Sequence, residues 1–244
     1  MDSNDLELFV DWDSPQKILV ILAHPDDPEF FCGASIAYWC ARGHEVRYCL
    51  LTRGDKGVNG RIIPPQTLKK MREEEQRAAA AVLGVKQVSF LDYPDGYLVP
   101  TLEARRDVVR VIRRERPDII VTCDPLNYFP APNRINHPDH RVAGQIVMDA
   151  VFPAAGNPMF FPELLTEEGL EPHEVREVWF SLTRQPNVRL DVTPYWDQKI
   201  EALRSHRSQI PDFNELEARM RARLAPGSTP EQPRYEEYFY RVVW

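Results

Sequence analysis

The stretch LVILAHPDDPEFFCGASIAYW, residues 19–39, decides the fold of this chain. Its first part is an unbroken apolar run, typical of a strand that is buried on both faces. The run stops at HPDD, residues 24–27, and a helical pattern follows from Gly33. A strand that turns directly into a helix is the first half of a βαβ unit. Pro-Asp-Asp alone is ordinary turn chemistry, which leaves open why a histidine and two acids gather at the end of a hydrophobic strand.

Strand and helix patterns alternate along the first two-thirds of the chain, which favours a mostly parallel sheet with right-handed crossovers. We expect strands at 17–23, 45–52, 87–92, 117–123 and 174–183. We expect helices at 33–43, 67–85, 101–116, 139–152 and 194–210. No internal repeat or clear linker divides the 244 residues. The sequence therefore predicts one α/β domain over residues 1–244, a mostly parallel sheet flanked by helices, with a flexible loop at 225–234.

Composition and charge argue against several kinds of partner. The 37 acidic and 30 basic residues give a net charge of −7 without a long basic block, so nucleic acid and anionic membranes are not expected partners. No apolar run approaches the ~18 residues of a membrane span. The beginning, MDSNDLELFVDWD, is acidic where a signal peptide is basic, and we expect a cytoplasmic protein. The four cysteines form no Cys-x-x-Cys pair, which argues against a disulfide framework or a sulfur-rich zinc site.

A second histidine-containing cluster, HPDH at residues 137–140, has the same setting as the first. It follows the strand expected at 117–123 after a loop, 124–136, and it precedes a helix. Ligands of open α/β sheets bind beyond the carboxyl ends of the strands. We therefore expect the two clusters to meet in space, although more than a hundred residues separate them.

Together the two clusters contain the residues of a catalytic zinc site, for which two histidines and one carboxylate are the minimum set when one position stays open for water. We predict His24, Asp27 and His140 as ligands of Zn²⁺. Zinc lowers the pKa of its water to about 7, so that a nearby carboxylate can complete the deprotonation. Asp26 is placed for that task, and His137 remains to stabilise an oxyanion or to protonate a leaving amine.

Asp139 has a supporting place in this arrangement, because a carboxylate behind a ligand can hold an imidazole in its working tautomer. Each cluster also has a simpler interpretation, as a helix cap or turn with surface histidines. Their joint position at strand ends favours the metal site. Histidine and carboxylate ligands also suit Fe(II), so iron remains an alternative to zinc.

The chain resembles the LmbE-like, or PIG-L, family of zinc-dependent N-deacetylases. The matching segments occur in the family's order: AHPDD (23–27), MREEEQRAAAAVLGV (71–85), FLDYPDG (90–96), NHPDH (136–140) and KIEALRSHRSQ (199–209). The resemblance implies a Rossmann-like α/β fold. It also implies zinc ligands at His24, Asp27 and His140, a general base at Asp26, and at His137 a group that polarises the carbonyl or stabilises the oxyanion.

Further candidates surround these motifs. The resemblance implies that Arg72 helps to shape the substrate pocket. Arg53 opens the loop RGDKGVNGRIIPPQ at a strand end, where it either binds substrate or is a solvated charge. Asn136 is a candidate substrate contact in the loop before HPDH. His206 either approaches the pocket or lies on a helix surface. Asp95, with Asp92, either shapes the pocket or forms a turn.

The family pattern is altered after HPDD, where Pro28 and then Glu29 follow. Proline suits a first helical turn because its missing N–H has no partner there in any case. The change leaves the predicted ligands intact.

We predict a metal-dependent hydrolase that removes an acetyl or other acyl group from the nitrogen of an N-acetylated amino sugar or a related small amide. An amidase acting on a larger thiol-sugar conjugate is an alternative, and so is a non-catalytic metal- or sugar-binding module. Asp26 and His137 argue against the module, because binding alone needs neither. Relatives often form homo-oligomers, for which the apolar 151–162 stretch is a candidate contact.

Overall fold

The structure, a computed structural model, describes residues 6–57, 60, 62–229 and 231–244. Residues 1–5 of the N-terminal stretch, 58, 59 and 61 of the loop after Arg53, and 230 of the expected 225–234 loop lie outside the described residues. The strands are β1 (Glu7–Leu8), β2 (Lys17–Leu22), β3 (Glu45–Thr52), β4 (Gln87–Tyr93), β5 (Ile119–Cys123), β6 (Glu177–Ser181), β7 (Val188–Asp191) and β8 (Glu236–Val243). The helices are α1 (Asp27–Ala41), α2 (Pro65–Leu83), α3 (Leu102–Glu115), α4 (Pro138–Asp149), η2 (Ala150–Ala155), α5 (Pro162–Thr166), η3 (Thr193–Tyr195), α6 (Trp196–Leu203) and α7 (Phe213–Arg221).

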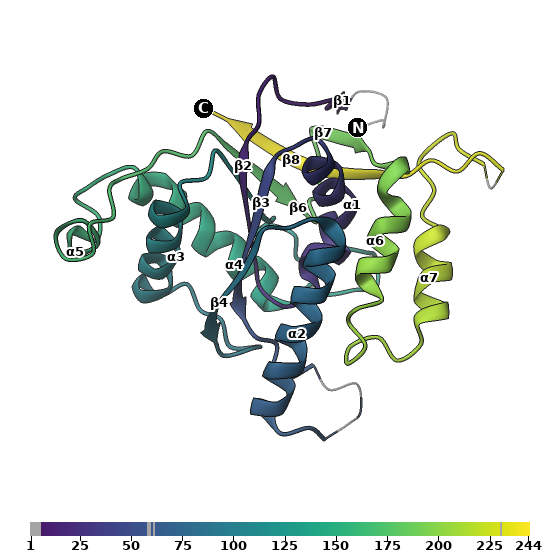
Figure 1. Ribbon diagram of the computed structural model, residues 1–244, viewed down its shortest axis with the longest axis horizontal. Helices are drawn as coiled ribbons and strands as arrows, with labels where there is room; N and C mark the ends of the chain where they lie inside the picture. Colours follow the sequence, from purple (N-terminus) through teal and green to yellow (C-terminus); the bar gives the residue numbers. More distant parts are fainter. Residues whose placement is uncertain (1–5, 58–59, 61, 230) are drawn as a thin grey trace.

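The described strands form one sheet in the order β1-β7-β8-β6-β5-β2-β3-β4. The strands from β6 to β4 are mutually parallel, whereas β8 runs antiparallel to both of its neighbours. Figure 1 shows α3 and α4 on one face of this sheet and α1, α2, α6 and α7 on the other. The predicted fold class, a mostly parallel α/β sheet flanked by helices, is confirmed.

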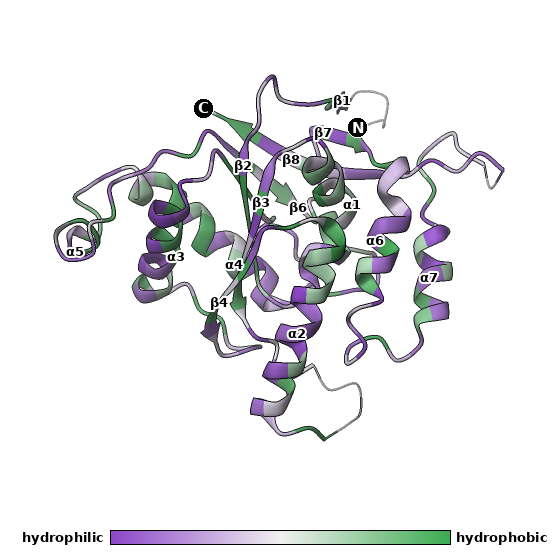
Figure 2. Cartoon of the chain, viewed as in Figure 1, coloured by the Kyte–Doolittle hydropathy of each residue, from purple (hydrophilic) through white to green (hydrophobic). Residues whose placement is uncertain are grey.

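Two hydrophobic cores fill the two spaces between the sheet and the helices. Successive side chains of β2 alternate between them: Ile18, Val20 and Leu22 face the core beneath α1, α2 and α6, whereas Leu19 and Ile21 face the core beneath α3 and α4. Both sets are buried, which explains the continuous apolar run in this strand. In Figure 2, α3 carries hydrophilic and hydrophobic bands in alternation, as a helix with one buried face should.

The position of β2 fixes where a ligand can bind. β2 pairs with β3 on one side and with β5 on the other, so the chain winds outward in both directions from the β2–β5 pair. Such a reversal of strand order opens a crevice at the carboxyl ends of the two strands. The HPDD turn follows β2, and the segment that follows β5 leads to HPDH, so the topology directs both clusters to one crevice.

Gly144 allows α4 to approach the end of β5 closely. A Cβ atom at this position would lie 2.2 Å from the carbonyl oxygen of Cys123 and 3.1 Å from Cδ of Pro125. Real Cβ atoms do not come so near a backbone oxygen, so only glycine permits this spacing. The approach sets the height at which the first turn of α4 lies over the sheet edge.

We expect Gly144→Ala to destabilise the protein by about 1–3 kcal/mol, because α4 has to move away from β5. Urea unfolding of both proteins measures the difference. Gln145→Ala, on the exposed side of the same helix, is the matched control and should change the unfolding free energy by less than about 0.5 kcal/mol. Equal stability of Gly144→Ala and the native chain would contradict the close packing.

α1 is interrupted at Cys32, whose φ of −149° and ψ of 25° are not helical. A buried ion pair bridges the interruption. Glu237 of β8 accepts hydrogen bonds from the backbone N–H groups of Ala34, at 3.3 Å, and Ser35, at 2.7 Å. Lys199 of α6 donates to the carbonyl of Phe30 at 3.0 Å and to Glu237 at 2.5 Å. The helix interruption is therefore stabilised from the C-terminal half of the chain.

The element boundaries differ from expectation in several places. The helix expected from residue 33 begins at Asp27, and the helix expected from 67 begins at Pro65. The helix expected to reach residue 210 ends at Leu203, and of the residues that follow it His206 and Ser208 are buried. The strands β1, β7 and β8 and the helices α5 and α7 were not expected. In the described ranges, no helix combines the length and apolar character needed to cross a bilayer.

Candidate active site

The turn after β2 presents the first cluster. Asp26 has a φ of 89°, in the left-handed region that is uncommon for residues other than glycine, and Asp27 begins α1. The Oδ2 atom of Asp27 accepts a hydrogen bond of 2.8 Å from the backbone N–H of His24 and lies 3.3 Å from Nδ1 of its ring. This short loop fixes the ring of His24 beside the start of the helix.

The start of α4 presents the second cluster. His137 is the N-cap, and its Nδ1 accepts from the backbone N–H of Asp139 at 3.2 Å. Pro138 occupies the first turn, one residue before the expected start of the helix. Asn136 donates to the carbonyl of Asn127 at 2.8 Å, which anchors the preceding loop.

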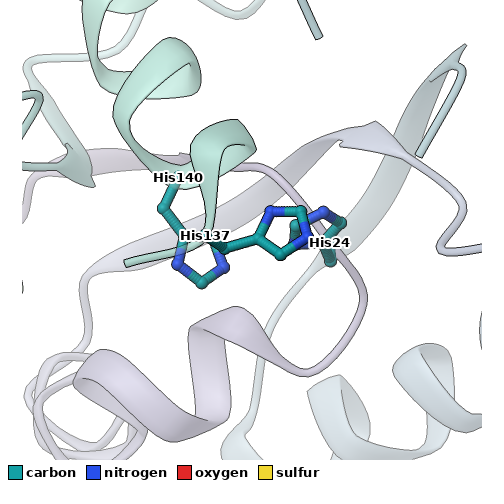
Figure 3. A group of neighbouring side chains, drawn as sticks. All are labelled: His24, His137 and His140. Atoms are coloured by element: carbon teal, nitrogen blue, oxygen red, sulfur yellow. The ribbon is translucent and has the colours of Figure 1, made fainter. Parts of the chain in front are cut away.

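The two turns bring three imidazoles together. The ring centroids of His24 and His140 lie 5.2 Å apart, those of His24 and His137 lie 4.6 Å apart, and His137 and His140 are separated by 5.3 Å. One nitrogen from each ring lies within 4.8 Å of the others. Figure 3 shows the rings gathered in one place, His24 from the turn after β2 and the other two from the start of α4. The predicted convergence of the two clusters is present.

Asp27 lies between two of these rings. Its Oδ1 is 3.1 Å from Nε2 of His140, and its Oδ2 is 3.3 Å from Nδ1 of His24. The nitrogens of His24, His137 and His140 are close enough to share one ion, whereas the predicted ligand set contains Asp27 in place of His137. The assignment of His24, Asp27 and His140 as ligands stays a prediction that the direct contacts of Asp27 support.

Two more carboxylates lie behind His24. Its Nε2 is 3.1 Å from Oδ1 of Asp95 and 3.2 Å from Oδ2 of Asp139. Asp139 is fully buried and also accepts backbone hydrogen bonds from Gly96, at 2.7 Å, and Leu98, at 3.3 Å. Asp139 therefore contacts an imidazole as expected. Asp95 therefore lies in the pocket, the first of the two alternatives, and its position after β4 was the signal for it.

The acids and imidazoles shift one another's pKa. Burial alone would raise the pKa of Asp27, but the charges of His140 and His24 and their hydrogen bonds outweigh burial and lower it. Burial would lower the pKa of His24, yet Asp27, Asp139 and Asp95 raise it well above its usual value. The pKa of Asp95 falls to about 2, because hydrogen bonding and charge from His24 outweigh burial. A cation that binds here must displace the proton that these acids hold on His24.

Asp26 lies beside the cluster and is held by α2. Its Oδ2 accepts from Nη2 of Arg72 at 3.1 Å, and its backbone N–H donates to Oε1 of Gln76 at 2.7 Å. Burial raises the pKa of Asp26, and the charge of Arg72 opposes that rise only in part. A raised pKa suits a carboxylate that takes up a proton during a reaction.

The three residues predicted to bind substrate have protein partners. Arg72 is buried, and besides Asp26 it donates to the carbonyls of Pro25, at 2.5 Å, and Gly54, at 3.0 Å. Arg53 pairs with Glu73, and its Nε lies 3.3 Å from Oδ1 of Asp92. The side chains therefore contribute to the shape of the crevice, and their contact with substrate stays a prediction.

Asn136, the third of these residues, is buried with its Oδ1 3.0 Å from Nδ1 of His140. Since an amide oxygen only accepts hydrogen bonds, Nδ1 carries a proton, and the ring presents Nε2 to Asp27 as the nitrogen that could bind a cation. This contact gives Asn136 a defined place behind a predicted ligand, which its loop position in the sequence could not indicate.

Glu29 and His206 meet although 177 positions separate them. Both are fully buried, with Nε2 of His206 3.0 Å from Oε2 of Glu29. His206 follows the end of α6, so the interpretation as a helix-surface histidine is wrong. A single residue, Gln76, connects this pair to the cluster. Its amide nitrogen donates to Glu29, and its amide oxygen accepts from the backbone N–H of Asp26.

The fold and the site define an α/β protein with a carboxylate–imidazole centre of the kind that binds a divalent cation at a strand switch point. The model of the PIG-L family, described as GlcNAc-PI de-N-acetylase, matches residues 19–151. The chain belongs to this family, and the predicted resemblance is confirmed.

Particular relatives are similar over most of the chain. Diacetylchitobiose deacetylase of Thermococcus kodakarensis is 36% identical over 208 residues, which cover 85% of this chain and 75% of that protein. A 1D-myo-inositol 2-acetamido-2-deoxy-alpha-D-glucopyranoside deacetylase of Thermobispora bispora is 28% identical, with 80% of each chain covered. The solved structure of N,N'-diacetylchitobiose deacetylase from Pyrococcus horikoshii, bound to its inhibitor MPG, superposes with a TM-score of 0.83. Its sequence identity is 31%, and the match covers 93% of this chain and 84% of that one.

Proposed function

We propose that this protein is a zinc-dependent hydrolase that removes an acetyl group from the nitrogen of an N-acetylated amino sugar. The observation that carries the proposal is the convergence of His24, Asp27 and His140 beside the separate carboxylate of Asp26, in a chain of this family. The similar proteins named above are deacetylases of acetamido sugars, which supports this substrate class.

The donor set fits a zinc ion. Each oxygen of Asp27 points to one imidazole nitrogen, and the contact of Asn136 with Nδ1 of His140 directs Nε2 of that ring toward Asp27. In the proposal, His24, Asp27 and His140 hold the ion, while Asp139 and Asp95 keep the ring of His24 oriented. When bound, zinc supplies Lewis-acid polarisation and a more acidic water.

The remaining residues carry the proton transfers. Asp26 takes a proton from the attacking water, for which its raised pKa and its partly exposed carboxylate are suited. The pKa of His137 is lowered by burial and by His24 and His140, which favours the neutral ring, and this ring donates a hydrogen bond to the developing oxyanion. The proton that Asp26 takes up then passes to the departing amine. Arg72 keeps the carboxylate of Asp26 turned toward the crevice through its 3.1 Å contact.

A cavity of about 370 Å³ borders the site and has room for more of the substrate than the acetamido group. Phe31 connects the cavity to the histidine cluster, because its ring lies 5.1 Å from that of His140, centroid to centroid, and also lines the cavity. Phe30, Trp196 and Tyr238 add aromatic surface to the walls. Flat aromatic rings suit the apolar faces of sugars, so we place a second sugar unit here. The cavity also leaves room for the larger conjugate considered above.

Thr183→Trp, which introduces an indole at the cavity wall, should raise KM for N,N'-diacetylchitobiose several-fold and leave KM for N-acetylglucosamine nearly unchanged. The two KM values are measured by acetate release. Thr166→Trp, on exposed α5, is the matched control and should change neither value. Equal effects of Thr183→Trp on both substrates would place the second sugar elsewhere.

Acetate release from a panel of N-acetylated sugars, with the zinc-loaded protein and with chelator-treated protein, tests the proposed function. We expect turnover that chelation abolishes and that added zinc restores. Binding of amino sugars without acetate release from any amide would instead indicate a binding module. Faster turnover of bulky thiol-sugar amides than of simple acetamido sugars would favour the larger conjugate as the substrate.

A further inference from the structure

We propose that Gln76 is a positioning residue for Asp26, and that a buried pair formed by Glu29 and His206 fixes the orientation of Gln76. The inference rests on the proposed function, since it takes Asp26 as the base of that reaction. It assigns a role to Gln76, Glu29 and His206, which the reaction scheme above does not use.

Gln76 controls the backbone of Asp26 directly. It lies in the middle of α2, is fully buried, and accepts the hydrogen bond from the N–H of Asp26 at 2.7 Å. That N–H belongs to a residue with a φ of 89°, a conformation that persists only when its surroundings hold it. Without this acceptor the peptide before Asp26 would lose a buried partner and could rotate.

Glu29 determines which end of the Gln76 amide faces Asp26. Nε2 of Gln76 lies 2.9 Å and 3.0 Å from the two carboxylate oxygens of Glu29. The amide nitrogen donates to both of these oxygens, so the amide oxygen is the end that faces the N–H of Asp26. The reverse orientation would place an amide N–H against the N–H of Asp26. Glu29 therefore selects the useful orientation of Gln76.

His206 in turn holds Glu29. Its Nε2 lies 3.0 Å from Oε2 of Glu29, and the hydroxyl of Tyr48 lies 3.4 Å from Oε1. Glu29 and His206 are both fully buried, so these are enclosed contacts without competition from solvent. The chain of contacts runs from the segment after α6, through α1, to α2 and back to the turn after β2.

Arg72 and Gln76 complement each other. They lie four residues apart on α2 and therefore on one face of the helix. Arg72 contacts the carboxylate of Asp26 and the carbonyl of Pro25, whereas Gln76 contacts the N–H of Asp26. One helix thus fixes both the backbone and the side chain of the proposed base.

Gln76→Leu tests the inference, because leucine keeps most of the volume and removes the amide. We expect kcat for acetate release to fall by about 10- to 100-fold, the effect of a displaced catalytic group, with KM and bound zinc unchanged. Gln198→Leu, which removes a glutamine amide that donates to the carbonyl of Val82 at 2.7 Å, is the matched control and should retain native kcat. If Gln76→Leu does not fold, Gln76→Met provides the same test.

A double-mutant cycle with Asp26→Asn separates positioning from general support of the fold. If Gln76 acts through Asp26, Gln76→Leu should cause no further loss in the Asp26→Asn background. Equal losses in both backgrounds, or an active native enzyme whose kcat is unaffected by Gln76→Leu, would overturn the inference. A native protein that releases no acetate from any amide would refute the proposed function instead.

Discussion

Asp26→Asn should lower the turnover number for acetate release by about 10²- to 10⁴-fold, the usual contribution of a general base. Asparagine preserves the shape of the side chain and its acceptor oxygen for Arg72 but cannot take up a proton. Bound zinc should remain stoichiometric, because among the described contacts none joins the Asp26 carboxylate to His24, Asp27 or His140. Steady-state kinetics and metal analysis of the same samples measure both quantities.

The matched control is Asp197→Asn, an exposed residue of α6 paired with Arg221. It removes one carboxylate far from the cluster and should leave kcat within about two-fold, as expected for a surface substitution. A zinc-loaded Asp26→Asn protein with a native rate would show that another group is the base. Loss of zinc from the same variant would mean that Asp26 belongs to the ligand set.

His140→Ala should abolish both metal binding and turnover. The substitution removes the ring that contacts Asp27 at 3.1 Å and leaves two of the three predicted ligands. Loss of a residue that merely supports a ligand costs ~10–100-fold in metal affinity, and loss of a ligand itself should cost at least as much. Titration with a competing chelator measures the affinity, and acetate release measures the turnover.

His173→Ala is the control for this experiment, because His173 is half-buried and bonded to the carbonyl of Pro117 rather than to the cluster. It should leave zinc affinity unchanged.

His137→Ala should retain zinc and lose turnover. If His137→Ala emptied the site while His140→Ala did not, the metal would be held by a different set, in which His137 replaces His140.

The parallel part of the sheet and the place of the site were predictable because their signals are local. The apolar run of β2 and the HPDD turn adjoin in sequence, and the same holds for HPDH and α4. Since parallel strands end at one edge of a sheet, the meeting of His24 and His140 followed from topology without any knowledge of contacts.

The C-terminal part was not predictable in the same way. β8 is antiparallel and inserts between β6 and β7, and β7 pairs with the short β1 from the beginning of the chain. Such pairings depend on contacts between distant segments, which hydrophobic periodicity does not specify. β1, with two residues, and β7, with four, are also too short to give a clear pattern.

The supporting place of Asp139 was predicted, whereas those of Asn136 and Glu29 escaped prediction for a related reason. Asn136 lies in a polar loop and Glu29 in a first helical turn, and both places are usual for exposed residues. Their burial results from tertiary contacts, with His140 in one case and with Gln76 and His206 in the other. The predicted ligands and Asp139 were evident in the sequence, whereas the contacts of Asn136 and Glu29 became evident only from the packing.

The interruption of α1 at Cys32 links β8 to the HPDD turn after β2. Asp27 lies on the short first piece of that helix, and Lys199 and Glu237 fasten this piece to β8. A local opening that separates β8 from β6 would free the piece while the central strands stay paired. Under mild heating or low denaturant, the enzyme should thus release its ion before its circular dichroism changes, and metal retention would report on the integrity of the C-terminus.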